Sequence, residues 1–304
     1  MCALEIYVLN VGQGDTTIIK TPQDNIVVID AYRPPKVKDA LDTIGAHQTI
    51  THLVVTHPHL DHYSAVSRLL EDYDVEEVSL APFWQYAGTP MYHEIINASE
   101  EEDIPVHFLA GYQRSYPDGG TYPALEGELC LELLGPPNYI LEELDRRHLL
   151  KPNHLSILAR LNCEGFTMVF AADAQMENWA HYDREGMLEQ PCNVLKAAHH
   201  GSKNGTQFER LDRLAPELVI VSSDPASGDE LPDLIGSAVF LEYDKENTVA
   251  LTARTGSIKI TVDDAGQYAA VSYDEGTTEL LSAHSPGPLP LTDWAAILGT
   301  RVPA

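Results

Sequence analysis

The sequence has few basic residues for its length. Of its 304 residues, 19 are Lys or Arg and 46 are Asp or Glu, so the formal net charge is -27. A chain this acidic repels polyanions at long range unless basic residues or metal ions gather locally. The composition therefore does not favour a general nucleic-acid groove.

Cysteine is also scarce. The four cysteines lie far apart and form no CxxC pair: Cys2, Cys130, Cys163 and Cys192. This spacing indicates neither a zinc knuckle nor a disulfide scaffold, and reduced thiols are the simplest interpretation.

Long apolar runs are absent. No stretch approaches the roughly 18 consecutive apolar residues that span a bilayer. The N-terminus shows no basic region followed by an apolar stretch, because Glu5 interrupts it. We therefore expect a cytoplasmic protein with no membrane partner. No internal repeat of fixed period is present.

Short β-branched runs and helical periodicities alternate along the chain. Turn signals separate three runs with the pattern of antiparallel strands, at residues 4–10, 16–20 and 26–30. Further strands are predicted at 156–161 and 167–173, with three closing strands within 248–273. Helices are predicted at 36–45 and near 91–102, 176–188 and 206–214. Strands followed by helices, twice over, predict an α/β (α+β) fold of two sheets with helices outside. We expect one domain over residues 1–284 and a Pro-rich tail at 285–304.

Three histidines and an aspartate directly follow an apolar run in HLVVTHPHLDH, and the candidate ligands are His57, His59, Asp61 and His62. Imidazole and carboxylate suit zinc, manganese or iron, whereas Mg²⁺ and Ca²⁺ prefer mostly oxygen. So short a segment does not easily bring four ligands to one ion. It therefore predicts two adjacent ions, one facing His57 and His59 and the other facing Asp61 and His62.

Two further strand ends carry candidate ligands. Asp173 ends the run TMVFAAD, where a carboxylate fits helix capping as well as metal ligation. His199 and His200 follow another apolar strand in LKAAHHGSKNG. Three strand ends that each deliver ligands indicate a metal centre more strongly than any one of the motifs.

At these residues the chain resembles the metallo-β-lactamase superfamily, whose hallmark is HxHxDH. The similarity is closest to the β-lactamase-like domain of ComEC-type competence proteins. LNVGQGDTTII looks like that group's DVGQGD signature, LKAAHHGSKNGT looks like its LKxxHHGS block, and PNHLSILARL followed by TMVFAAD is similar to two of its strands. The resemblance runs from about residue 5 to 224 and implies a four-layer αββα sandwich.

Carried over residue by residue, the resemblance makes Asp173 the carboxylate that bridges both ions. It makes His199 or His200 the ligand that completes the site of Asp61 and His62. It also implies that Asp30 orients the ligand loop from outside the metal site, and that Asp15 of GQGD lies near the metals.

The superfamily's usual fifth histidine, in a GHTxGS-like context, has no clear counterpart in this sequence. The ComEC-like group has asparagine at that point, which Asn153 matches, and the neighbouring His154 is the alternative ligand. If neither residue ligates, the ion at His57 and His59 is weakly held.

Two divalent ions, zinc or manganese, would share a hydroxide and hold the attacking and leaving oxygens of an in-line displacement. The sequence therefore predicts a phosphodiesterase or nuclease whose substrate is a phosphodiester, with a nucleic acid or nucleotide as one class. Asp61 and Asp173 are the predicted catalytic carboxylates. Lys203 and the backbone amides of Gly201 and Ser202 are predicted anion contacts, with turn geometry and solubility as the alternative explanation.

Two alternatives stay open at this stage. The same hydroxide attacks carbonyl groups, so a lactam or thioester is a second substrate class. The second alternative is a regulatory partner that keeps the fold but does not catalyse a reaction, although the intact ligand set argues against this. Full-length ComEC-type proteins also carry membrane segments, and this sequence shows none, so we expect a free-standing, soluble relative.

Overall fold

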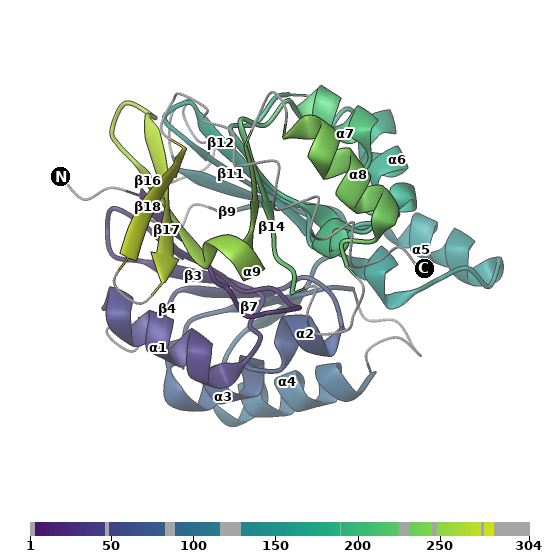
Figure 1. Ribbon diagram of the computed structural model, residues 1–304. Helices are drawn as coiled ribbons and strands as arrows, with labels where there is room; N and C mark the ends of the chain where they lie inside the picture. The colour runs from purple at the N-terminus through teal and green to yellow at the C-terminus, as the bar shows by residue number, and fades with distance from the viewer. Residues whose placement is uncertain are drawn as a thin grey trace, which may run out of the picture.

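Two large β-sheets lie face to face, and helices cover the outer face of each sheet (Figure 1). The structure, a computed structural model, describes residues 4–45, 49–82, 89–115, 129–188, 190–224, 231–244, 248–274 and 277–282.

The first sheet has nine strands in the order β18-β17-β16-β1-β2-β3-β5-β7-β8. Their bounds are β1 (Leu4–Val8), β2 (Thr17–Lys20), β3 (Ile26–Ile29), β5 (His52–Val55), β7 (Val78–Leu80), β8 (Val106–Phe108), β16 (Ser257–Val262), β17 (Tyr268–Asp274) and β18 (Thr277–Ser282). Pairing is antiparallel from β18 to β3 and parallel from β3 to β8. A small parallel pair joins β4 (Thr49–Ile50) and β6 (Asp74–Val75).

The second sheet has seven strands in the order β15-β14-β13-β12-β11-β10-β9. Their bounds are β9 (Tyr112–Ser115), β10 (Cys130–Leu134), β11 (Leu158–Cys163), β12 (Phe166–Phe170), β13 (Val194–Lys196), β14 (Leu218–Val221) and β15 (Thr248–Leu251). Pairing is antiparallel from β9 to β12 and parallel from β12 to β15. Each sheet thus has one antiparallel half and one parallel half.

The helices form the two outer layers. On the first sheet lie α1 (Pro34–Ile44), α3 (Val66–Asp72) and α4 (Thr89–Glu101), and on the second lie α6 (Met176–Arg184), α7 (Phe208–Leu214) and α8 (Leu234–Tyr243). The remaining helical segments are α2 (Leu60–Tyr63), α5 (Asn138–Arg146), α9 (Thr252–Thr255) and the 3₁₀ turns η1 (Pro152–Leu155) and η2 (Ala198–Gly201).

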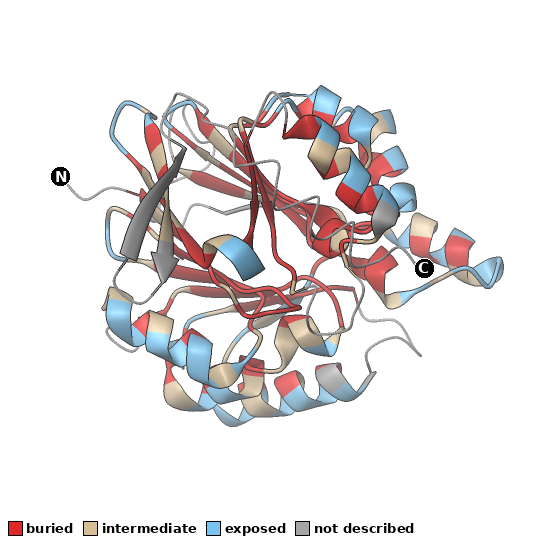
Figure 2. Cartoon of the chain, viewed as in Figure 1, coloured by how far each residue is buried: buried red, intermediate tan, exposed pale blue. Residues whose placement is uncertain are grey.

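Alternate residues of the central strands enter different cores. In β1, Ile6 and Val8 pack between the sheets, whereas Tyr7 packs under the helices of the first layer. In β3, Val27 and Val28 divide in the same way. Strands buried on both faces are mostly apolar rather than alternating with polar residues: β3 is apolar and buried throughout, and in β1 only Glu5 is polar and half-buried. Figure 2 shows the central strands as largely buried ribbons.

These layers confirm the predicted αββα architecture. The sequence did not predict helices α5 and α8. Within the predicted closing strands at 248–273, the short helix α9 lies between β15 and β16. The domain bounds of residues 1–284 stay a prediction, and the tail at 285–304 lies outside the described residues. In the part of the chain that the structure describes, no helix combines the length and apolar character needed to cross a membrane.

The strands that precede the candidate ligands end at a common edge. β5 belongs to the first sheet, and β12 and β13 lie side by side in the second sheet. The Ile157 amide donates a 2.9 Å hydrogen bond to the Thr56 carbonyl and so joins the two sheets directly after β5. The carboxyl ends of parallel strands are where loops of an α/β sheet gather side chains for chemistry.

Candidate metal centre

One buried carboxylate fixes the loop that follows β5. Asp30 accepts hydrogen bonds from the Thr56 backbone amide (2.8 Å), the Thr56 hydroxyl (2.7 Å) and Nδ1 of His62 (2.7 Å). Because the Thr56 hydroxyl donates to Asp30, its oxygen accepts from Nδ1 of His57 at 3.2 Å. Both imidazoles therefore keep Nε2 free to face the centre, as metal-binding histidines do.

A second pair of histidines follows β13, in η2. His199 (φ 49°, ψ 50°) and His200 (φ 50°, ψ 28°) both have left-handed backbone conformations, which are unfavourable for residues that carry a Cβ atom. Nδ1 of His200 donates a 2.8 Å hydrogen bond to the Ser222 carbonyl, so its Nε2 also faces inward. Backbone strain of this kind is concentrated at functional sites.

Asp173 lies between the histidines and is 2% exposed. Its Oδ2 is 3.5 Å from Nε2 of His57 and 3.6 Å from Nε2 of His199. Its Oδ1 is 3.3 Å from Nε2 of His62 and 3.6 Å from Nε2 of His200. Each oxygen of this one carboxylate therefore faces a different set of imidazoles.

Among the described residues, the donors form four overlapping groups, two of which include Asp15 (with Asp173 and His200, and with Asp30 and His62) and two of which do not. Within each group, all ligand atoms lie within 4.8 Å of one another. The two groups without Asp15 are His57, His59 and Asp173, the first group, and Asp61, His62 and His200, the second group. Nε2 of His200 is 3.4 Å from Oδ2 of Asp61. The structure thus places His200, rather than His199, with Asp61 and His62.

Several of the inward-facing atoms are unpaired. Among the described residues, Nε2 of His57, His62 and His200 and Oδ1 of Asp173 are buried without a hydrogen-bond partner, which is costly unless a ligand satisfies them. The four Asp173 contacts of 3.3–3.6 Å are close to the roughly 3.4 Å between two ligands that each lie about 2.1 Å from a tetrahedral cation. The donor types and their spacing fit divalent cations.

The charges of the centre also call for cations. Burial alone would lower the pKa of His62, but the carboxylates of Asp173 and Asp30 outweigh it and raise that pKa well above its usual value. Burial alone would raise the pKa of Asp173, but the imidazoles of His62, His200 and His57 hold it well below its usual value. These carboxylates thus attract positive charge, which bound cations supply in place of protons.

A buried ion pair lies next to the second group. Nζ of Lys196, in β13, donates a hydrogen bond to Oδ2 of Asp15, and both side chains are at most 6% exposed. Oδ1 of Asp15 is 3.8 Å from Nδ1 of His200. Asp15 therefore lies beside the centre, where the sequence placed it. Lys196 was missed, although a lysine inside the apolar strand NVLKAA was a visible signal, because lysine is rarely buried without a partner.

Asn153 and His154 differ in their orientation. Nδ2 of Asn153 donates a 3.1 Å hydrogen bond to Oδ2 of Asp173. His154 points elsewhere, because its Nδ1 accepts from the Lys151 amide (3.0 Å) and its Nε2 is 3.4 Å from the Glu177 carboxylate. The structure does not bring His154 to the donors that surround Asp173.

The loop after η2 presents few free donors to an anion. The Ser202 amide donates to the His199 carbonyl at 2.8 Å, so the prediction that this amide contacts an anion is wrong. The Lys203 amide donates to the Asp233 carboxylate at 3.0 Å. The Lys203 residue is exposed, which leaves its ammonium group accessible.

The GQGD segment packs tightly against the ligand loop. Gly14 has φ 154°, and a Cβ atom there would lie 2.3 Å from the Tyr32 ring and 2.7 Å from the Asp61 carbonyl oxygen. The Asp15 amide donates to the same carbonyl at 3.0 Å. Glycine at position 14 therefore allows the loop that carries Asp61 to approach the Asp15 backbone.

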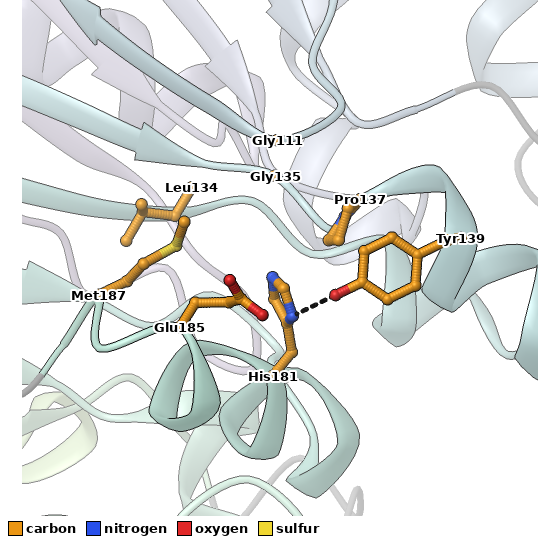
Figure 3. A pocket seen from close by; sticks show the side chains of 8 residues that line it. All are labelled: Gly111, Leu134, Gly135, Pro137, Tyr139, His181, Glu185 and Met187. Atoms are coloured by element: carbon orange, nitrogen blue, oxygen red, sulfur yellow. Dashed lines mark hydrogen bonds between the residues drawn. The ribbon is translucent and has the colours of Figure 1, made fainter.

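A separate cavity of about 210 Å³ opens near the end of β10. Figure 3 shows its lining: Gly111, Leu134, Gly135, Pro137, Tyr139, His181, Glu185 and Met187. The Tyr139 hydroxyl and Nδ1 of His181 are 3.1 Å apart and hydrogen-bonded. The cavity is smaller than most small-molecule sites, which begin near 300 Å³, and none of its lining residues belongs to the donor groups of the metal centre.

Comparison with known proteins assigns a family. The model of the metallo-beta-lactamase superfamily matches residues 9–223. ComE operon protein 3 of Bacillus subtilis (strain 168) is 22% identical over 241 residues, which cover 72% of this chain and 28% of that protein. The chain thus spans little more than a quarter of the length of this curated relative.

Solved structures share the fold at low sequence identity. The CmlA beta-hydroxylase E377D mutant superposes with a TM-score of 0.51 at 14% identity, over 86% of this chain and 54% of that one. CmlA, a diiron beta-hydroxylase from Streptomyces venezuelae, superposes with a TM-score of 0.50 at 13% identity, over 82% and 52% of the two chains. At these identities the likeness shows the fold alone.

Proposed function

The chain belongs to the metallo-beta-lactamase superfamily, and from this membership and the geometry of its centre we propose that it is a dinuclear metal-dependent hydrolase that cleaves phosphodiester bonds. The observation that carries the proposal is the position of Asp173, which turns one carboxylate oxygen to His57 and the other to His62 and His200. A carboxylate shared in this way suits two cations side by side. Because one fold serves many reactions, the substrate class is argued from the site.

The residues present would hold the two ions differently. His57, His59 and Asp173 are the donors to one ion, and burial lowers the pKa of His59 to about 4, so it is a neutral donor at physiological pH. Asp61, His62 and His200 would be the donors to the other ion, and Asp173 would lie between the two. When bound, two divalent cations supply a water of lowered pKa and offset charge on the phosphoryl oxygens. Zinc and manganese both suit such imidazole and carboxylate donors.

The chain's own residues define the rest of the site. Asp30 and the Ser222 carbonyl hold the imidazoles of His62 and His200 in the tautomer that keeps Nε2 free. The exposed ammonium group of Lys203, three positions beyond His200, is a candidate contact for a phosphoryl oxygen. Asp61 and Asp173 are the carboxylates next to the reacting atoms and the candidate acceptors of a proton.

Electrostatics favour a small substrate over a long polymer. At a formal charge of -27, the chain repels a polyanion along its whole length, whereas a nucleotide or a short phosphodiester carries little charge. Within the proposal, small-molecule phosphodiesterase therefore ranks above nuclease.

The test is a substrate panel with metal-free protein reconstituted with Zn²⁺ or Mn²⁺. Bis(p-nitrophenyl) phosphate represents phosphodiesters, single-stranded DNA represents nucleic acid, and nitrocefin and an aryl thioester represent carbonyl substrates. We expect metal-dependent hydrolysis of the phosphodiester, and an Asp61→Ala variant with kcat/KM lower by about 10³-fold, or roughly 4 kcal/mol. Asp212→Asn, which changes an exposed aspartate of α7, is the matched control and should keep wild-type activity.

Two results would contradict the proposal. Turnover of nitrocefin or the thioester but not of the phosphodiester would move the substrate to the carbonyl class. Equal activity of Asp61→Ala and wild type would show that the measured hydrolysis does not occur at this centre.

A further inference from the structure

The two ions described above would have unequal numbers of protein donors. The second group offers Asp61, His62 and His200 together with Oδ1 of Asp173. The first group offers only His57 and His59 with Oδ2 of Asp173. Zinc and similar ions in protein sites take four ligands, with at least three from the protein. A fourth protein donor at the first group would make the two sites alike.

The residues on η1 do not provide that donor. Nδ1 of His154 accepts from the Lys151 amide, and its Nε2 lies against Glu177. Asn153 presents its NH₂ group to Oδ2 of Asp173, so the atom that faces the bridging carboxylate is a hydrogen-bond donor and not a lone pair. Asn153 therefore orients the carboxylate, and His154 is committed to other partners.

His199 is the remaining imidazole beside the same oxygen of Asp173, although its ring lies outside the 4.8 Å group of His57, His59 and Asp173, so it would turn inward to bind an ion. Its Nε2 is 3.6 Å from Oδ2 of Asp173, the same oxygen that lies 3.5 Å from Nε2 of His57. Both distances match the spacing between two ligands of one tetrahedral cation. Nδ1 of His199 is buried and has no hydrogen-bond partner among the described residues, so no protein contact holds this ring away from an ion.

The backbone explains how adjacent histidines reach opposite sides of one carboxylate. Both residues have left-handed conformations, and two hydrogen bonds fix the turn: the His199 amide donates to the Ala172 carbonyl, and the Ser202 amide donates to the His199 carbonyl, each at 2.8 Å. His199 then faces Oδ2 of Asp173 and His200 faces Oδ1. An ordinary strand would turn only every second side chain to one face.

We propose that His199 is the fourth protein ligand of the ion held by His57, His59 and Asp173, so that each histidine of the HHGS segment serves a different ion. The side chain of His199 is 21% exposed, whereas that of His200 is 2% exposed. The His199 side of the centre is therefore open to solvent, as is the side of Asp61, whose side chain is 31% exposed. The inference rests on the proposed metal centre and is independent of which substrate is cleaved.

The experiment is a Co²⁺ titration of metal-free protein, followed by visible absorption, with metal content measured after gel filtration. His199→Asn is the main variant, because asparagine tolerates the left-handed conformation better than most residues, and His199→Ala is the second. His200→Ala reports on the other ion. His93→Ala, which removes an exposed histidine of α4, is the matched control, and circular dichroism of each metal-free variant checks the fold.

We expect wild type and His93→Ala to bind two equivalents in two steps. Both His199 variants should weaken one step at least tenfold and spare the step that His200→Ala weakens. Adding His57→Ala to His199→Asn should affect only the step that is already weakened, because both residues bind the same ion.

Two outcomes would overturn the inference. If the His199 variants leave both steps unchanged, His199 is not a ligand. If they weaken the same step as His200→Ala, both histidines serve one ion. Because metal binding is measured without a substrate, protein that shows the expected titration but hydrolyses no phosphodiester would refute the proposed function and leave this inference standing.

Discussion

The imidazole of His62 donates a 2.7 Å hydrogen bond through Nδ1 to the carboxylate of Asp30, which ends a strand 32 residues earlier in the chain. The same carboxylate also holds Thr56 through its backbone amide and hydroxyl. One buried side chain thus fixes the start of the ligand loop and the tautomer of a ligand within it. The contact links the end of β3 to the ligand loop that follows β5.

Replacement of Asp30 by asparagine should weaken metal binding without removing a ligand. An amide is a poorer acceptor for the His62 imidazole and adds no negative charge, so we expect affinity for the second ion to fall about 10- to 100-fold. Competition titration with a chromophoric chelator measures the change. Asp39→Asn, at an exposed position of α1, is the control, and unchanged affinity in Asp30→Asn would show that this hydrogen bond does not tune the ligand.

Replacement of Lys196 alone should destabilise the protein more than replacement of Lys196 and Asp15 together. Lys196→Met leaves Asp15 buried without its counter-ion, at a cost of about 3–5 kcal/mol. The double variant Asp15→Asn/Lys196→Met should be less destabilised than the sum of the two single variants, because no unpaired charge is left. Urea unfolding in the presence of a chelator gives the free energies, and strict additivity would show that the two residues are not coupled.

A methyl group at position 14 should disturb the ligand loop. Gly14→Ala places a Cβ atom 2.7 Å from the Asp61 carbonyl, so we expect about 2–3 kcal/mol of destabilisation and weaker binding of the ion that Asp61 would hold. Gly45→Ala is the matched control. Gly45 also has a left-handed backbone (φ 72°), but a Cβ atom there meets nothing within 4 Å, so it should cost only about 1 kcal/mol and leave metal binding intact.

The ion pair of Asp183 with Arg210 should make stability fall in acid. The hydrogen bonds from Arg210 (2.7 and 2.6 Å) hold the pKa of Asp183 below its usual value of 3.8, with a further contribution from Arg213. Because the folded-state pKa is the lower one, the stabilisation is present above about pH 4 and is lost as the pH falls through the folded-state value. We expect Asp183→Asn to be about 1–2 kcal/mol less stable than wild type at pH 7.

The pH dependence supplies the check on this ion pair. Chemical unfolding of both proteins between pH 7 and pH 3 should show the difference shrinking at the acid end. A difference that stayed constant over this range would mean that the stabilisation does not come from the ionised carboxylate.

Removal of metal should lower thermal stability. The unpaired nitrogens of His57, His62 and His200 gain a partner only when cations bind. At a free-metal concentration 100 times Kd, one ion stabilises the folded state by about 2.7 kcal/mol, which corresponds to a rise in Tm of roughly 4 °C for a chain of this size. Thermal unfolding with and without a chelator measures it, and equal midpoints would contradict cation binding at the centre.

Local patterns in the sequence were sufficient to identify the candidate donors. The HxHxDH spacing, the carboxylate at the end of TMVFAAD and the HHGS segment each follow an apolar run, and strands that carry such runs end at a sheet edge. The αββα architecture and the family followed from the same segments. Helices α5 and α8 were not predicted: α8 is apolar on nearly all faces and so shows no helical periodicity, whereas α5 is clearly amphipathic and its signal was missed.

Other features depend on distances between segments that are remote in the chain, and only the tertiary structure decided them. It turned His200 to Asp61 and His199 to the other oxygen of Asp173, directed His154 to Glu177, and paired Asp15 with Lys196 across 181 residues. Residue types and spacing show which side chains can bind a cation. Which of them share one is set by backbone conformation and by the hydrogen bonds of neighbouring strands, because adjacent residues such as His199 and His200 have the same chemistry and differ only in direction.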